Sequence, residues 1–191
     1  MVKLEKGPGH VELKNDWPKP TVKPGWVLVE VAACGICGTD VHEYAMGPIV
    51  IPSKPHKLNG SILPQILGHE FSAEVLEVGK GVTNVKVGDR VSGEGHLIGM
   101  KSRMARAGHY HLDPETKGIG VNLPGAFAEY LKIPAFNAIH LPPEVDDEIG
   151  AILDPLGNAV PLGQPIKVRI DKASAGHSPL KALALLLDGD G

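Results

Sequence analysis

The sequence has few cysteines, no long apolar run and no marked excess of either charge. Its two cysteines, Cys34 and Cys37, are too few for a secreted disulfide framework. The first ten residues lack the apolar stretch of a signal peptide. The apolar run at residues 180–187 is far too short to cross a bilayer. We therefore expect a cytoplasmic protein with no membrane partner.

Charge and composition narrow the class of protein further. A formal net charge of -3 gives no electrostatic reason to bind nucleic acid or an anionic membrane. The 191 residues suit one domain, or one domain with an appendage. The 24 glycines and 17 prolines, together with valine-rich runs, predict short strands joined by tight turns and little helix.

Alternating valines mark the first expected strand, since Val27, Val29 and Val31 face one side of an extended chain. Further strands are expected at residues 71–78, 85–91 and 126–133, with a proline-rich surface loop at 47–64 and an exposed polar lobe at 97–118. The pattern predicts a small, mostly antiparallel β-barrel, which is a mainly β fold with a few short helices.

The last stretch, residues 161–191, differs from the rest in its residue pattern and is expected to form a tail. Residues 166–170 suit a short strand, and Ser178 followed by Pro179 suits the start of a short helix. Such a strand can pair with an open barrel edge, and the leucines of the helix can cover the same face. We expect the tail to dock on the barrel and to keep the chain monomeric or weakly dimeric.

Two short motifs carry the candidate chemistry. Cys34-x-x-Cys37 taken alone fits a redox pair, half of a zinc knuckle or two buried thiols. Gly68-His69-Glu70 taken alone fits a hydrogen-bonded histidine at a strand end. The combination of Cys37-Gly-Thr-Asp-x-His42 with Gly68-His69-Glu70 is much more specific than either part.

At this point the chain resembles the catalytic domain of zinc-dependent medium-chain alcohol dehydrogenases, a GroES-like barrel. The resemblance rests on ACGICGTDVHEY, GHEFSAEVLEVGKGV and VGDRV, and it covers residues 1–160. Residues 92–96, 118–138 and 154–160 look most like L-threonine 3-dehydrogenases, whereas the loop at 42–60 is similar to butanediol dehydrogenases. Ala73 stands where the family usually has glycine.

The resemblance implies a metal site. Cys37, His69 and Glu70 would bind a single catalytic Zn²⁺, and Asp154 stands where a later carboxylate reaches the metal in threonine dehydrogenases. Thiolate, imidazole and carboxylate are ligands that zinc favours, and a catalytic zinc keeps one position open. The substrate, a small alcohol, would take that open position.

The resemblance also implies catalytic roles for Thr39, His42 and Glu70. Zinc would act as a Lewis acid and stabilise the alkoxide of a secondary alcohol. Thr39 would hydrogen-bond this alkoxide, and His42 would carry its proton towards solvent. The hydride would pass to NAD, because no side chain can accept it.

Plainer interpretations of the same residues stay open. Thr39 can be a turn residue, Asp154 a helix cap and His42 a surface histidine. Cys34 is assigned to packing. His96 lies in a threonine-dehydrogenase-like stretch, where a substrate contact and a structural role are equally compatible with the sequence.

A nucleotide-binding fingerprint is missing from the sequence. We find no G-x-G-x-x-G between a strand and a helix, and only 31 residues follow Val160. A single βαβ unit already needs about thirty residues. We therefore expect no Rossmann domain in this chain, so that NAD would be used only if a nucleotide-binding domain were supplied.

A second zinc site is also missing. Many members of the resembled family hold a structural zinc with four cysteines, and Gly99, Ser102, Ala105 and Asp113 stand at those positions here. None of them offers a thiolate, so we expect one zinc rather than two. Both absences together suggest an engineered, minimised catalytic domain, and a natural truncated paralogue is the alternative.

Three functions remain in competition. The first is an oxidoreductase domain that binds zinc and an alcohol. The second is a zinc protein with weak hydrolytic activity, because zinc-bound water can act as a nucleophile. The third is a zinc-binding scaffold without dehydrogenase activity. Threonine-like and diol-like stretches coexist, so the sequence does not choose the alcohol.

Overall fold

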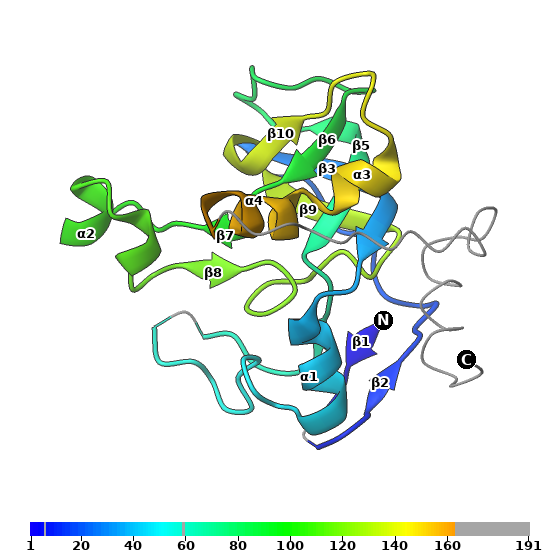
Figure 1. Cartoon of the computed structure of the whole chain (residues 1–191), viewed down its shortest axis with the longest axis vertical. Helices are drawn as coiled ribbons and strands as arrows, with labels where there is room; N and C mark the ends of the chain where they lie inside the picture. Colours follow the sequence, from blue (N-terminus) through cyan, green and yellow to red (C-terminus); the bar gives the residue numbers. More distant parts are fainter. Residues whose placement is uncertain (6, 59, 163–191) are drawn as a thin grey trace.

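The structure is a computed structural model that describes residues 1–5, 7–58 and 60–162 (Figure 1). The expected strand at 166–170 and the expected helix after Ser178 lie outside these residues, as does the docking of the tail. None of the helices in the described ranges combines the length and apolar character that a membrane crossing requires.

The described chain is mainly β with a few short helices, as the sequence predicts. The strands are β1 (Val2–Lys3), β2 (Val11–Glu12), β3 (Trp26–Gly35), β4 (Gln65–Ile66), β5 (Glu70–Val78), β6 (Arg90–Gly93), β7 (His96–Leu97), β8 (Lys117–Gly118), β9 (Tyr130–Pro134) and β10 (Ala138–His140). The helices are α1 (Gly38–Met46), α2 (Arg103–Arg106), α3 (Asp147–Ala151) and α4 (Leu153–Leu162), with short 3-10 turns η1 (Tyr110–Leu112) and η2 (Ala135–Asn137).

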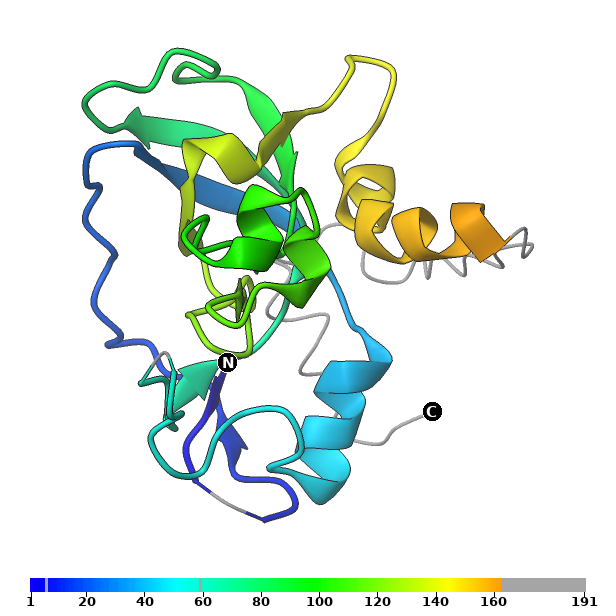
Figure 2. The same ribbon diagram turned by 90° about the vertical axis from the view of Figure 1, so that its left-hand side faces the viewer.

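A five-stranded antiparallel sheet with the order β10-β6-β5-β3-β9 forms the centre of the fold and curls around the core (Figures 1 and 2). The alternating valines of β3 face inward and are buried, whereas Glu30 between them is exposed. Phe71, Val75 and Leu131 join the same cluster from the neighbouring strands. The expected mostly antiparallel sheet is therefore confirmed.

Strands β3 and β5 set the position of the candidate site. They pair antiparallel along most of their length, and Gly35 at the end of β3 lies opposite Glu70 at the start of β5. Because the two strands run in opposite directions, Cys37 and His69 emerge at the same end of the pair. Two motifs separated by thirty residues of sequence are thereby brought together.

Two expected strands begin later than the sequence suggests. Residues 85–89 form a turn instead, in which the Asp89 carboxylate accepts a hydrogen bond from the Lys86 N–H at 2.9 Å. Residues 126 and 127 pair elsewhere, because Ala126 donates to the Gly68 carbonyl and Phe127 to the Leu67 carbonyl, both at 2.9 Å. These local and long-range bonds compete with the strand pairing that alternating apolar residues favour.

Helix α1 is the main element that the sequence pattern did not indicate. It starts at Gly38 because Asp40, in its first turn, accepts a hydrogen bond from the Cys37 N–H, as in a capping box. The hairpin of β1 and β2 lies beside it, with the Gly9 N–H donating to the Tyr44 carbonyl (Figures 1 and 2). Gly47 then ends the helix.

Glu43 fastens the following loop to α1. Its side chain is almost completely buried, and one carboxylate oxygen accepts hydrogen bonds from three consecutive backbone N–H groups, those of Ile49, Val50 and Ile51. The described residues of the stretch at 47–64 form no helix or strand, in agreement with the loop predicted there. Its first part is nevertheless fixed to the helix that carries Thr39 and His42.

The lobe at 97–118 projects to one side of the molecule, where Figure 1 shows α2. The carboxylate of Asp113 lies at its centre and is buried. It accepts hydrogen bonds from the Gly99 N–H at 2.7 Å and the Glu115 N–H at 3.3 Å. The Ser102 side chain also bonds to Asp113, and Ser102 caps α2 by accepting from the Ala105 N–H at 3.0 Å.

The four residues that stand at the cysteine positions of the resembled family therefore remain neighbours. Hydrogen bonds to one carboxylate link Gly99 and Ser102 to Asp113, and the buried Ala105 fills the fourth position. Burial by itself would raise the pKa of Asp113, but the hydrogen bonds outweigh it and the pKa is lowered. The hydrogen bonds to this carboxylate hold the lobe together.

We expect Asp113→Asn to loosen this lobe, because an amide cannot accept all the hydrogen bonds that the carboxylate accepts. Hydrogen exchange at the Gly99 N–H should become about tenfold faster at neutral pH. A carboxylate with a lowered folded pKa stabilises above its unfolded pKa of about 3.9, and this contribution disappears as the pH falls through the folded value.

The acid-induced loosening should therefore be weaker in Asp113→Asn than in the parent chain. Asp16→Asn, a change of an exposed aspartate outside the lobe, is the matched control and should alter neither measurement. Unchanged exchange at Gly99 in the Asp113 variant would show that the carboxylate does not hold the lobe.

Candidate metal centre

Three side chains from two separate motifs converge at the end of the β3–β5 pair. Cys37 follows β3 and precedes α1, His69 precedes β5, and Glu70 is the first residue of β5. The sulfur of Cys37, a ring nitrogen of His69 and a carboxylate oxygen of Glu70 all lie within 4.8 Å of one another. Within the described residues this is the only such group of three or more.

Two glycines allow this close approach. A Cβ on Gly35 would lie 2.5 Å from a carboxylate oxygen of Glu70, so a side chain there would displace the carboxylate. Gly68 has a φ of +90°, and a Cβ there would lie 2.8 Å from the backbone and ring of Phe127. The backbone around the site thus has little freedom to accept larger residues.

Asp40 connects the two motifs. Its side chain is buried, and its two oxygens accept hydrogen bonds from the Cys37 N–H at 3.0 Å and the Gly68 N–H at 3.1 Å. One carboxylate therefore fixes the residues that carry both the thiol and the imidazole. Burial raises the pKa of Asp40, partly offset by His69 and by these two N–H donors.

The imidazole of His69 faces the same carboxylate. Its Nδ1 is buried without a hydrogen-bond partner and lies 3.8 Å from Asp40 Oδ1. A metal-binding histidine commonly directs its second ring nitrogen at a carboxylate, which fixes the ring orientation. The arrangement of His69 and Asp40 has this form, with a slightly long separation.

The site gathers several acidic groups in partly buried surroundings. Burial raises the pKa of the Cys37 thiol, and contact with Thr39 lowers it in part. Burial likewise raises the pKa of Glu70, and the nearby Asp154 and Asp40 raise it further, against the hydrogen bond from Cys37. Negative charge here is costly without a cation, so a bound metal ion would relieve it.

The donor set suits zinc better than calcium or magnesium. One thiol, one imidazole and one carboxylate form a mixed sulfur, nitrogen and oxygen set, whereas calcium and magnesium prefer oxygen alone. The mutual distances within 4.8 Å suit three ligands around one ion. The residues present therefore fit the zinc that the sequence resemblance implies.

The residues expected to move a proton lie on α1 beside the thiol. Thr39 is partly buried, with its hydroxyl oxygen 3.7 Å from the Cys37 sulfur. His42 is exposed to solvent. Because residues three apart lie on one face of a helix, the two side chains share the same side of α1.

Asp154 lies in the first turn of α4, where it acts electrostatically on Glu70. The group of atoms within 4.8 Å does not include it. The structure thus places Asp154 near the other three residues without bringing it into the same tight group. Its expected role as a further ligand stays a prediction.

Two other residues named from the sequence do not belong to the group of three donor atoms. Cys34 packs against the hydrophobic core, and burial raises the pKa of its thiol far above the usual value, so it is a poor nucleophile. This agrees with the packing role assigned to it. His96 is exposed and contacts Glu94 at 2.8 Å.

Asp40 is the functional residue that the sequence analysis passed over. A signal was present, because an aspartate three residues after Cys37 fits the third position of a helix with Cys37 as its N-cap. The bond from Gly68 could not be foreseen, since it joins residues 28 positions apart.

Comparison with known proteins agrees with this geometry. The alcohol dehydrogenase GroES-like domain matches residues 23–143. An L-threonine 3-dehydrogenase of Ruegeria pomeroyi is 53% identical over 143 residues, which are 75% of this chain and 40% of that protein. The L-threonine 3-dehydrogenase of Francisella tularensis is 45% identical over 160 residues, which are 84% and 43%.

Solved structures show the same fold. The 2R,3R-butanediol dehydrogenase from Bacillus subtilis superposes with a TM-score of 0.72 at 37% identity, over 88% of this chain and 48% of that one. A zinc-binding dehydrogenase from Sinorhizobium meliloti bound to NADP gives a TM-score of 0.63 at 33% identity, over 74% and 38%. The chain spans less than half the length of these relatives, and it belongs to the alcohol dehydrogenase GroES-like domain family.

Proposed function

We propose that this chain is the zinc-binding catalytic domain of an NAD-dependent dehydrogenase for L-threonine or a vicinal diol. The observation that carries the proposal is the convergence of Cys37, His69 and Glu70 donor atoms within 4.8 Å. The likeness to threonine and butanediol dehydrogenases supports the substrate class. A nucleotide-binding domain is needed to complete the reaction.

Cys37, His69 and Glu70 would hold the zinc, and Asp154, which acts electrostatically on Glu70, would be a further ligand. Zinc supplies Lewis acidity, which makes a coordinated alcohol easier to deprotonate near neutral pH. Asp40 would act through His69, because its carboxylate accepts a hydrogen bond from the N–H of the preceding residue, Gly68, and faces Nδ1 of the His69 ring. Burial raises the pKa of Glu70, and the hydrogen bond with Cys37 partly offsets this rise and so favours the negative charge of Glu70.

Thr39 and His42 provide the path for the proton. The Thr39 hydroxyl lies beside the Cys37 sulfur and can accept a proton from a substrate hydroxyl while passing on its own. His42 lies on the same side of α1 and is exposed, so it can exchange a proton with water. The secondary alcohol would lose its hydride to the nicotinamide ring of NAD, held by the other domain.

The chain should bind one zinc ion per molecule, because it has one intact ligand set and a lobe held by Asp113. Metal analysis after loading and desalting should approach one equivalent. Cys37→Ala and His69→Ala should each weaken zinc binding by more than about 100-fold. This exceeds the loss expected when a residue that only hydrogen-bonds to a metal ligand is changed. Cys34→Ala and His96→Ala are matched controls that should keep full stoichiometry. Two equivalents of zinc would contradict the assignment.

Zinc affinity should rise with pH, because binding must displace the proton of the Cys37 thiol, whose pKa burial raises. Between about pH 6 and 8 the logarithm of the affinity should increase by roughly one per pH unit for this proton. Calorimetry in two buffers of different ionisation enthalpy counts the protons released. Cys34→Ala should release as many as the parent, and an affinity independent of pH would exclude Cys37 as a ligand.

This 191-residue chain by itself should not oxidise alcohols with NAD at an enzymatic rate. Hydride transfer requires both partners to be held in contact, and the sequence contains no dinucleotide fingerprint. The zinc-loaded chain should still bind L-threonine or 2,3-butanediol in calorimetry, unlike the zinc-free chain. NADH formation at about 1–1000 per second, the usual range of enzymes, would falsify this expectation.

A further inference from the structure

A cavity of about 650 Å³ lies on the side of the sheet formed by β9. The segment at residues 14–26 makes one wall, and residues 128–132 make the other. Neither Cys37 nor His69 nor Glu70 lines it, so it is distinct from the metal centre. Its volume falls within the range of about 300–1,000 Å³ that is typical of small-molecule sites.

The cavity collects aromatic side chains that are rare in this sequence. The chain has two tryptophans, three tyrosines and three phenylalanines. Four of these eight rings line the cavity, namely Trp17, Trp26, Phe127 and Tyr130. Both tryptophans are among them, and Trp17 is 42% exposed. Flat apolar faces are therefore available to a planar ligand.

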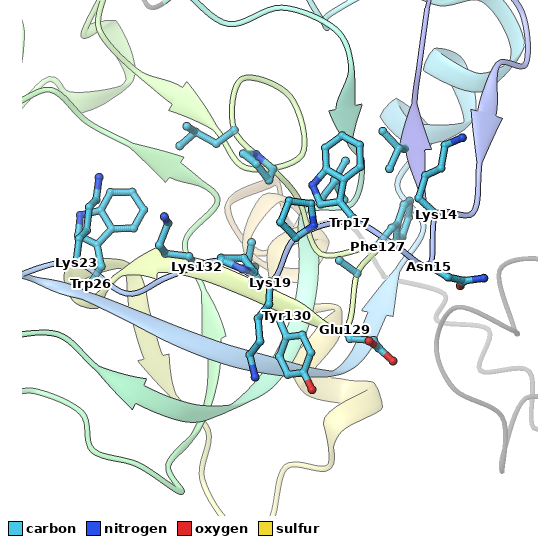
Figure 3. A pocket seen from close by; sticks show the side chains of 18 residues that line it. Lys14, Asn15, Trp17, Lys19, Lys23, Trp26, Phe127, Glu129, Tyr130 and Lys132 are labelled. Carbon is cyan, nitrogen blue, oxygen red and sulfur yellow. The ribbon is translucent and has the colours of Figure 1, made fainter.

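The same cavity is positively charged. Lys14, Lys19, Lys23 and Lys132 line it, against the single carboxylate of Glu129. Figure 3 shows Lys23 and Trp26 at one end, Lys14 and Asn15 at the other, and Trp17 and Tyr130 between them.

Three of these lysines have no acidic partner among the described residues. Lys14 is paired with Glu12. In the described part of the chain, no carboxylate lies within the 4.0 Å of an ion pair from Lys19, Lys23 or Lys132. An anion entering the cavity would meet ammonium groups that no carboxylate of the described ranges pairs with.

Two of the free ammonium groups are already placed by aromatic rings. The Nζ of Lys19 lies 3.8 Å from the centre of the Tyr130 ring, and the Nζ of Lys23 lies 3.7 Å from that of Trp26. Such cation–π contacts reduce the freedom of a lysine side chain while leaving its N–H groups able to donate. Charge and flat apolar surface thus occur side by side on both walls.

We infer that this cavity is a binding site for a planar aromatic anion, such as an aryl carboxylate or aryl phosphate. The ring would lie against Trp26 and the neighbouring aromatic side chains, where apolar area is removed from water. The anionic group would be bound by Lys23 and by Lys132, which lies two residues from Pro134, the strand partner of Trp26. The inference is independent of the proposed dehydrogenase function, because it uses none of the metal-binding residues.

The two tryptophans provide a direct measurement. The ¹H–¹⁵N spectrum of the full 191-residue chain contains one indole N–H signal for each, so both signals report on the cavity. Titration with 2-naphthoate should shift both signals, with a Kd of about 0.1–1 mM for a ligand of this size. Neutral 2-naphthamide tests the charge, and cyclohexanecarboxylate tests the flat ring; both should bind at least about threefold more weakly.

Variants of the lysines test the anion contacts without touching the core. Lys23→Gln and Lys132→Gln should each weaken 2-naphthoate binding about threefold to fivefold, whereas Lys23→Arg and Lys132→Arg should retain it. Lys57→Gln, an exposed lysine outside the cavity, is the control and should have no effect. Removal of zinc with a chelator should leave the affinity unchanged.

Several results would overturn the inference. One is the absence of any indole shift at about 5 mM 2-naphthoate, fiftyfold above the lower expected Kd. This result would instead favour an extended polypeptide segment as the occupant of the cavity. Equal affinity for 2-naphthoate and 2-naphthamide would show a merely apolar surface. An equal loss in Lys57→Gln and Lys23→Gln would show unspecific attraction to net charge.

Discussion

The geometry of the metal centre depends on the buried carboxylate of Asp40. It accepts hydrogen bonds from the N–H groups of Cys37 and Gly68, which belong to the two motifs that supply the donor atoms. It also starts α1 and faces the ring of His69. A charged acceptor with two N–H donors forms stronger bonds than a neutral pair. It therefore joins the two segments that carry the candidate ligands.

A buried carboxylate also organises the projecting lobe, but there its charge is balanced differently. Around Cys37 the acidic groups outnumber the nearby cations, and burial raises the pKa of both the thiol and Glu70. A metal ion would remove that penalty. Around Asp113 the carboxylate is surrounded by hydrogen-bond donors, and its pKa is lowered. One site needs a cation from outside, whereas the other is already satisfied by its own chain.

The positively charged cavity beside β9 shows how far the chemistry of the domain extends from the metal centre. Four of the eight aromatic rings gather there with lysines that come from two distant segments, residues 14–23 and 132. No linear motif marks this surface, because the charges are spaced widely in sequence. Only the packing of the first segment along β9 brings them together.

The sequence by itself determined the inward valines of β3 and the loop at 47–64, because residue spacing decides these locally, and it indicated Cys37, His69 and Glu70 as candidate ligands through a family resemblance. Tertiary structure alone decided the turn at 85–89, the bond of Asp40 to Gly68 and the distance of Asp154 from the group. These depend on backbone groups that meet only after β3 and β5 pair, and hydrogen bonds between residues far apart leave no periodic pattern in a sequence.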